Sequence, residues 1–246
     1  MHRLDRLIAR NTGASRKTVN QWCKRGVITD ADGGRLRPDQ KIPASELPCA
    51  LRLDGTPLML HDEYHLMLHK PVGVVTALKD GLHPTAYELV KAAPLGPELR
   101  PVGRLDLDCA GLLLWTTSGP LLHRLTHPKY KVPRTYHVAL ARPPATSTPP
   151  ATLDDGTVPH IVSWDRIEPD TAHPALLAPD GTACLARICL DGGAYHEVKR
   201  IFAAMGSHVL ALARIEHGPL SLPRDLEAGA HRVLRRAQLE GASAPG

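Results

Sequence analysis

Apolar positions near the start of the chain repeat with the period of an α-helix. Residues 4–8 place three apolar side chains on one helical face. Ser15 is typical of a helix N-cap, and a second helix is expected from there to about Lys24. The stretch 25–29 then turns into a short strand, and residues 32–34 (Asp-Gly-Gly) are typical of a hairpin turn. The pattern predicts a small helix-helix-hairpin unit at the N-terminus.

Short apolar runs follow and predict strands. Residues 66–76 are expected to form a strand, a turn at Lys70-Pro71 and a second strand. Residues 83–85 (His-Pro-Thr) are typical of a helix start with proline in the first turn. The uninterrupted apolar run 111–116, bounded by turn residues, predicts a buried strand, and the alternation in 134–138 predicts a half-buried one.

The remaining segments differ strongly in pattern. Residues 193–206 predict an amphipathic helix of nearly four turns that ends at Gly206. Its expected apolar face consists of Val198, Ile201, Phe202 and Met205. The Pro-rich stretch 143–150 predicts a surface loop, and 151–182 an irregular antiparallel extension. The segment 42–57 has the composition of an interdomain linker.

Length and composition narrow the class of protein. With 246 residues and 26.7 kDa, the chain is long enough for one large and one small domain. No apolar run could span a bilayer, and the first residues lack the apolar core of a signal peptide, so we expect a cytoplasmic protein without a membrane partner. The five cysteines are scattered and form no CxxC pair, which argues against a disulfide framework or a zinc site.

The charge of the chain favours an anionic partner, and its low aromatic content limits base stacking to a few side chains. The net charge of +5 and the pI near 9.0 suit nucleic acid. Aromatic residues make up only 4% of the chain, so any base stacking depends on one or two placed rings. The fourteen histidines form no metal-binding motif, and no metal is expected.

One cluster of charges enters an apolar run. Arg104, Asp106 and Asp108 precede the expected strand 111–116, and charges at such a place are costly unless they pair or serve the chemistry. By chemistry alone, the favoured interpretation is a turn in which Asp106 or Asp108 accepts hydrogen bonds from backbone amides.

The sequence of this cluster, GRLDxDxxGLLLxT, resembles the catalytic motif of the Rsu/Rlu group of RNA pseudouridine synthases. Three further blocks resemble that family in the same order: the strand around Lys70-Pro71, the RTYHV strand 134–138, and 193–206, which is similar to GRYHQVKRMFAAxG. The resemblance runs from Arg3 to Leu234. It implies an α+β fold, in which a small S4-like domain with its linker (1–60) precedes a catalytic domain (61–246) with a mixed, mostly antiparallel sheet.

The resemblance also implies roles for five residues. Asp106 would be the essential carboxylate beside the ribose, acting as nucleophile or as base. Lys199 would pair with it, Tyr136 would stack on the flipped uracil, Arg104 would support the space that the nucleotide leaves, and Leu212 would seal the pocket. No cofactor is implied, because the reaction is a redox-neutral isomerisation. From the residues alone, Lys199 could equally lie on a solvated helix face, and Tyr136 could be an ordinary sheet tyrosine.

The N-terminal unit resembles an S4 RNA-binding domain through Arg3-Leu4-Asp5, Ser15-Arg16 and Gly26-Val27. The alternative is an ordinary basic helical pair with solvated charges. The residues expected to contact RNA phosphates are Arg3, Arg16, Lys17 and Arg25, with Arg200 as a further RNA or structural contact.

The YHxVKRxF wording of residues 195–202 is similar to family members that modify a uridine in 16S ribosomal RNA, and we expect a monomer that acts on this RNA. Two alternatives stay open: a synthase for 23S rRNA or tRNA, and a non-catalytic RNA-binding assembly factor. The chain departs from the family wording at Cys109, Ser118, Ala194 and Glu197, where Thr, Asp, Arg and Gln are usual. The last two departures make this face less basic, which puts the choice of target in question.

Overall fold

The computed structural model describes residues 1–241 and divides into two compact units. Unit 1 consists of Met1–Tyr64 together with Ala92–Glu98, and unit 2 of His65–Lys91 and the chain from Leu99 onward. The first division falls close to the boundary expected after residue 60. The return of Ala92–Glu98 to unit 1 has no signal in the sequence pattern.

Unit 1 contains the two expected helices and two small sheets. Its elements are β1 (His2–Arg3), α1 (Leu4–Thr12), α2 (Arg16–Arg25), β2 (Ile28–Asp30), β3 (Lys41–Ile42), the 3₁₀-helix Ala44–Glu46, β4 (Cys49–Leu53) and β5 (Thr56–Leu60). Ser15 caps α2 as predicted, since its hydroxyl accepts a 3.1 Å hydrogen bond from the Thr18 backbone N–H. Strands β2, β4 and β5 form one antiparallel sheet, and β1 pairs with β3.

The prediction of a linker over 42–57 is wrong. This segment contains β4 and the first two residues of β5, and these strands form an antiparallel hairpin through Asp54 and Gly55, both at positive φ. Leu51 and Leu60 of the hairpin are buried with α1 in one apolar cluster, which explains why the segment folds. Pro57 argues against a strand in the sequence pattern, but β5 is an edge strand, where proline is tolerated.

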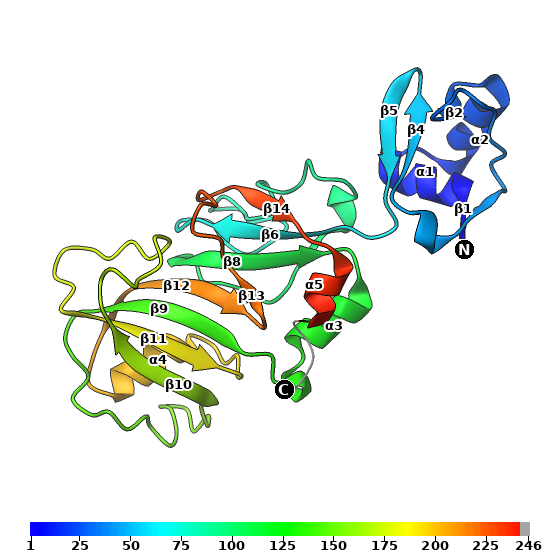
Figure 1. Cartoon of the computed structure of the whole chain (residues 1–246). Helices are drawn as coiled ribbons and strands as arrows, with labels where there is room; N and C mark the ends of the chain where they lie inside the picture. Colours follow the sequence, from blue (N-terminus) through cyan, green and yellow to red (C-terminus); the bar gives the residue numbers. More distant parts are fainter. Residues whose placement is uncertain (242–246) are drawn as a thin grey trace. The chain divides into compact units, whose positions relative to one another are not determined.

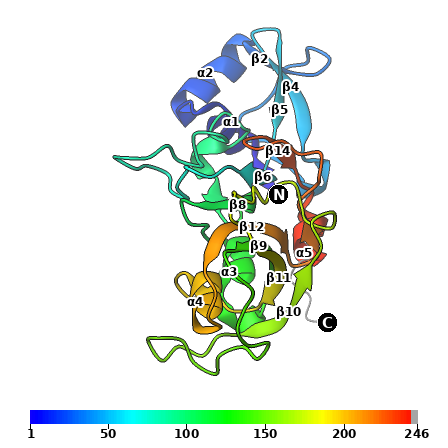
Figure 2. The same cartoon turned by 90° about the vertical axis from the view of Figure 1, so that its left-hand side faces the viewer.

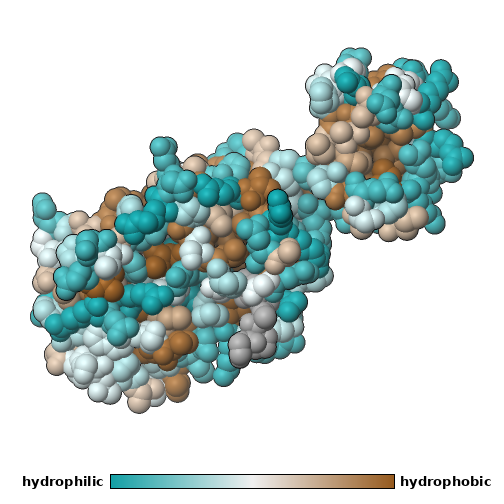
Figure 3. Space-filling view, in the orientation of Figure 1, coloured by the Kyte–Doolittle hydropathy of each residue, from teal (hydrophilic) through white to brown (hydrophobic). Residues whose placement is uncertain are grey.

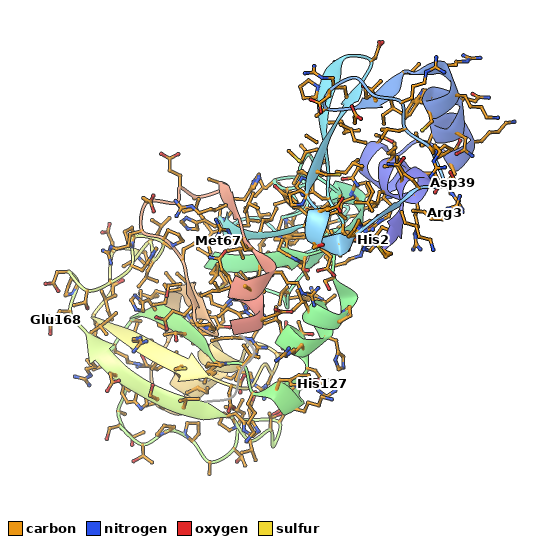
Figure 4. The ribbon with its side chains drawn as sticks, turned by 45° about the vertical axis from the view of Figure 1, so that its right-hand side comes forward. His2, Arg3, Asp39, Met67, His127 and Glu168 are labelled. Carbon is orange, nitrogen blue, oxygen red and sulfur yellow. The ribbon has the colours of Figure 1, made fainter. Side chains whose placement is uncertain are left out.

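A buried carboxylate organises the start of unit 1. Asp5, whose surface is only 1% exposed, lies 3.1 Å from the Arg3 guanidinium and 2.6 Å from that of Arg16. Hydrogen bonds from Arg3 and then Arg16 outweigh the effect of burial and lower the pKa of Asp5 to about 2. Asp39 also attracts Arg3, and both are labelled in Figure 4. Arg3 and Arg16 therefore stabilise a buried charge, which the sequence analysis did not anticipate, whereas Lys17 and Arg25 are exposed.

Unit 2 is built on one large mixed sheet (Figure 1). Its strands are β6 (His65–Lys70), β7 (Arg100–Pro101), β8 (Cys109–Thr116), β9 (Arg134–Leu140), β10 (Ile161–Ile167), β11 (Cys184–Leu190), β12 (Val209–His217), β13 (Leu220–Ser221) and β14 (His231–Val233). The order is β10-β11-β9-β12-β8-β6-β14, with β13 paired to β12 and β7 to β8. Only the β12–β8 pair is parallel among these described strands, which confirms the prediction of a mixed, mostly antiparallel sheet.

Helices cover both faces of this sheet. They are α3 (Gly119–Thr126), α4 (Glu197–Ala204) and α5 (Arg236–Gly241), with a 3₁₀-turn at Pro128–Tyr130. Figures 1 and 2 show α4 on one face and α5 on the opposite face. Leu125 of α3 and Leu239 of α5 share a buried cluster with Leu112 and Leu114 of β8. Strand β8 is buried along its whole length, as the apolar run predicts.

Three expected elements of unit 2 are shorter than predicted or absent. After β6 no second strand follows the Lys70-Pro71 turn, because Val75 makes only a single bridge to Thr85. The segment after Pro84 forms successive turns rather than a helix. Helix α4 has eight residues, because His196 adopts a left-handed conformation (φ 50°) directly before it. Its apolar face is buried as predicted, and Gly206 follows it with φ 78°.

The loops and the surface agree with the sequence pattern. Residues 143–150 contain no helix or strand, and β10 forms the expected antiparallel extension by pairing with β11. The face drawn in Figure 3 is mostly hydrophilic, with smaller apolar areas between the polar side chains. Within residues 1–241, no helix combines the length and the apolar character that a membrane crossing requires.

A buried histidine predicts a loss of stability in mild acid. His137 on β9 accepts a 3.0 Å hydrogen bond at Nδ1 from the His173 backbone N–H, and burial lowers its pKa from 6.5 to about 4. As pH falls below 6.5, the unfolded chain takes up a proton that the folded chain excludes until about pH 4. We therefore expect a loss of up to about 3 kcal/mol of unfolding free energy between these values. Urea titrations at pH 7, 6, 5 and 4.5 measure it.

The control for this prediction is His137→Asn, which keeps an acceptor near the Nδ1 position but cannot titrate in this range. Its unfolding free energy should depend less on pH than that of the wild-type protein. Parallel pH curves for the two proteins would contradict the assignment to His137.

Candidate active site

Five residues predicted to serve the chemistry line one pocket of unit 2. The pocket has a volume of about 500 Å³ and lies between the loop before β8, the strands β9 and β12, and the start of α4. The predicted residues in its wall are Arg104, Asp106, Tyr136, Lys199 and Leu212. The fold thus brings together side chains that are up to 108 residues apart in the sequence (212 − 104).

The loop that carries Asp106 is held by its backbone on both sides. Thr76 donates from Oγ1 to the Leu105 carbonyl (2.9 Å) and accepts from the Leu105 N–H (3.1 Å). The Leu107 carbonyl accepts a 2.8 Å hydrogen bond from the Gly73 N–H. The irregular segment after the Lys-Pro turn thus contacts this loop through one backbone N–H, that of Gly73, and through the Thr76 hydroxyl. The position of Asp106 is therefore fixed from both neighbours.

Lys199 lies between two carboxylates rather than beside one. Its Nζ is 2.7 and 2.8 Å from the two oxygens of Asp108 and 3.7 Å from Oδ2 of Asp106. Burial opposes the charge of Lys199, but the hydrogen bond to Asp108 and the attraction of both carboxylates outweigh it and raise its pKa. Desolvation acts to raise the pKa of Asp108, but the hydrogen bond and the positive charge of Lys199, with smaller contributions from a backbone N–H and His196, together lower it. The expected pairing with Asp106 is thus present as the longer contact, and the closer one to Asp108 was not predicted.

A histidine that the sequence analysis did not single out also contacts Asp106. His196 Nε2 is 3.5 Å from Asp106 Oδ1, and its ring stacks on Tyr195 at 3.8 Å between centroids. Tyr195 is 76% exposed, so the outer part of this ring pair faces solvent. The only sequence signal was the HxxK spacing of His196 and Lys199, which places both near the first turn of α4.

Another part of the pocket wall contains the half-buried Tyr136 and the fully buried Arg214. Tyr136 of β9 is the register partner of Arg214 on β12, so the two side chains lie on the same face of the sheet. Burial raises the pKa of the Tyr136 phenol, although the positive charge of Arg214 acts against the rise. Arg214 donates from Nε to the Leu112 carbonyl at 2.8 Å. Arg214 was missed, although an arginine within the apolar run 209–215 is a signal.

Lys70 supports the floor of the site. It is completely buried, and its Nζ donates to the carbonyls of Cys109 (2.8 Å) and Pro71 (2.9 Å). Burial lowers its pKa to about 8. The Lys-Pro turn is therefore more than a rigid corner, because its lysine fixes the first residue of β8, directly after the Asp106 loop.

Arg200, expected as an RNA or structural contact, is held by acidic residues. Its guanidinium binds the carboxylates of Asp154 and Asp155 and donates to the Tyr195 carbonyl at 3.2 Å. The following residues, among them Thr157, line the pocket. Arg200 therefore connects one wall of the pocket to α4, which favours the structural alternative.

Residues 64–204 match the sequence profile of the RNA pseudouridylate synthase family, and the chain belongs to this family. It is accordingly a pseudouridine synthase. The chain is 34% identical to the ribosomal small subunit pseudouridine synthase A of Escherichia coli K12, over 96% of this chain and 98% of that protein. The protein of that name from Pasteurella multocida is also 34% identical, over 96% of this chain and 97% of its own. A crystal structure of a pseudouridylate synthase superposes with a TM-score of 0.56 and 26% identity, covering 98% of this chain and 100% of the other.

Proposed function

We propose that this enzyme converts a specific uridine of 16S ribosomal RNA to pseudouridine, with Asp106 as the essential carboxylate. The observation that carries the proposal is the convergence of Asp106, Tyr136 and Lys199 on one pocket. The choice of RNA is supported by the two relatives that match nearly the whole chain, both of which are ribosomal small subunit pseudouridine synthases.

The geometry supports a division of labour among the pocket residues. The target uridine leaves its stack, and its base enters between Tyr136 and Leu212. Asp106 then acts at the ribose while the bond from C1′ to N1 breaks; the uracil turns, C1′ bonds to C5, and the C5 proton is lost as N1 gains one. Lys199 holds the nearby carboxylates ionised, and the exposed Arg104 supports the space that the nucleotide leaves.

Unit 1 supplies, in this proposal, an S4-like RNA-binding domain formed mainly by residues 1–60. The exposed Lys17 and Arg25 on α2 are its candidate phosphate contacts, since such contacts position a protein without reading sequence. Arg3 and Arg16 keep exposed guanidinium surface beside Asp5 and complete the basic face.

Carbodiimide mapping of ribosomal RNA from cells that lack the gene tests the proposal. One pseudouridine of 16S RNA should be missing, and wild-type protein should restore it. If the missing pseudouridine lies in 23S RNA or tRNA, the 16S assignment is wrong. If every pseudouridine of these RNAs persists, the proposed function fails and the assembly-factor alternative gains support.

A further inference from the structure

Arg214 is a buried cation that has no role in the reaction proposed above. Only 1% of its surface is exposed, and it lies in the pocket wall. Its Nε is satisfied by the Leu112 carbonyl, but the terminal nitrogen Nη2 is buried without a hydrogen-bond partner among the described residues. A buried donor of a charged group is costly when it is unpaired. Such a donor at a pocket wall is suited to an acceptor that arrives with the ligand.

The backbone is arranged to bring this residue close to the pocket. Arg214 lies opposite Gly111 on β8, and a Cβ at Gly111 would be 2.2 Å from the Arg214 carbonyl oxygen. Only glycine therefore permits the approach of β8 and β12 at this point. Leu212 and Arg214 are two residues apart on β12, so both side chains point to the same face of the sheet, and both line the pocket.

We propose that Arg214 reads the base of the target nucleotide, by donating a hydrogen bond from its free terminal nitrogen to a carbonyl oxygen of uracil. This inference rests on the proposed function, because it places the base between Tyr136 and Leu212. Arginine can donate but never accept, and uracil offers acceptors at O2 and O4. Arg214 is the cross-strand partner of Tyr136 and lines the same pocket, so its guanidinium lies on the same face of the sheet as the ring that stacks on this base. A site built in this way rejects a ligand that leaves the buried donor unpaired.

Binding of single nucleotides tests the inference apart from catalysis. The probes are UMP, 2-thio-UMP and 4-thio-UMP, titrated into the full chain and followed by NMR. Sulfur is the weaker acceptor, so wild-type protein should bind one of the two analogues about 10-fold more weakly than UMP. The sensitive position identifies the carbonyl that Arg214 contacts. Equal binding of all three, or no binding of UMP, overturns the inference.

Variants assign the preference to Arg214 itself. In Arg214→Met, which keeps the length without the donors, UMP and the sensitive thio analogue should bind equally. The matched control is His217→Gln, on the same strand and equally buried, but outside the pocket wall; it should keep the full preference. A preference that survives in folded Arg214→Met overturns the inference, and if this variant does not fold, the wild-type titrations still decide. Asp106→Asn should also keep the preference, so failure of the catalytic proposal remains distinguishable.

Discussion

Asp106→Asn is expected to lose at least about 10³-fold in the rate of pseudouridine formation on unmodified 16S rRNA transcript, with folding unchanged. The amide keeps the shape of the carboxylate but can act neither as nucleophile nor as base. Asp106 is partly exposed and lies beside Lys199 and His196, so its charge contributes little to the packing of unit 2. Single-turnover release of tritium from RNA labelled at uridine C5 measures the rate, and urea unfolding checks the fold.

Asp108→Asn is the matched control, because it removes the same charge two residues further along the loop. Asp108 holds Lys199 more closely than Asp106 does, at 2.7 Å against 3.7 Å. Without that charge Lys199 remains available to Asp106, and we expect the rate to change by less than about 10-fold. A larger loss in Asp108→Asn than in Asp106→Asn would reverse the roles of the two carboxylates.

The pocket residues that could be predicted from the sequence are those that lie in recognisable motifs. Asp106, Tyr136 and Lys199 each lie in a block that resembles a family motif, and all three line the pocket. The burial of β8, the apolar face of α1 and the Ser15 cap of α2 were predicted, because local sequence pattern controls them. Which carboxylate Lys199 would hold more tightly could not be predicted, since that depends on how the loop curves after Asp106.

The features that could not be predicted from the sequence depend on contacts between residues far apart along the chain. The β4–β5 hairpin exists because Leu51 and Leu60 complete a core with α1, whereas the prolines of residues 42–57 suggested a linker. The segment after Lys70 is not a strand; its Gly73 N–H and Thr76 hydroxyl hydrogen-bond the distant Asp106 loop, a contact that the local sequence pattern does not show. The role of Arg214 could not be predicted from the sequence, where it is one arginine in an apolar run. Its unpaired terminal nitrogen depends on the strands β8 and β9 that pack around it.

The same packing predicts a large loss of stability in Gly111→Ala. Gly111 has φ +107°, and an added Cβ would lie 2.2 Å from the Arg214 carbonyl oxygen and 2.8 Å from its nitrogen. Both atoms are backbone in the only parallel pair of the described sheet, so neither can move without separating β8 from β12. We expect unit 2 to lose at least about 4 kcal/mol of unfolding free energy, from overpacking and backbone strain together. Urea unfolding, followed by the fluorescence of the buried Trp115 on β8, measures this loss.

Gly119→Ala separates this effect from the general cost of replacing a glycine. Gly119 begins α3, and a Cβ there meets no atom within 4 Å. The unfolding free energy of Gly119→Ala should stay within about 0.5 kcal/mol of the wild-type value, because the position is open and alanine favours a helix. Equal midpoints for the two variants would mean that β8 and β12 tolerate a side chain between them. The close strand contact that brings Arg214 to the pocket would then not depend on glycine.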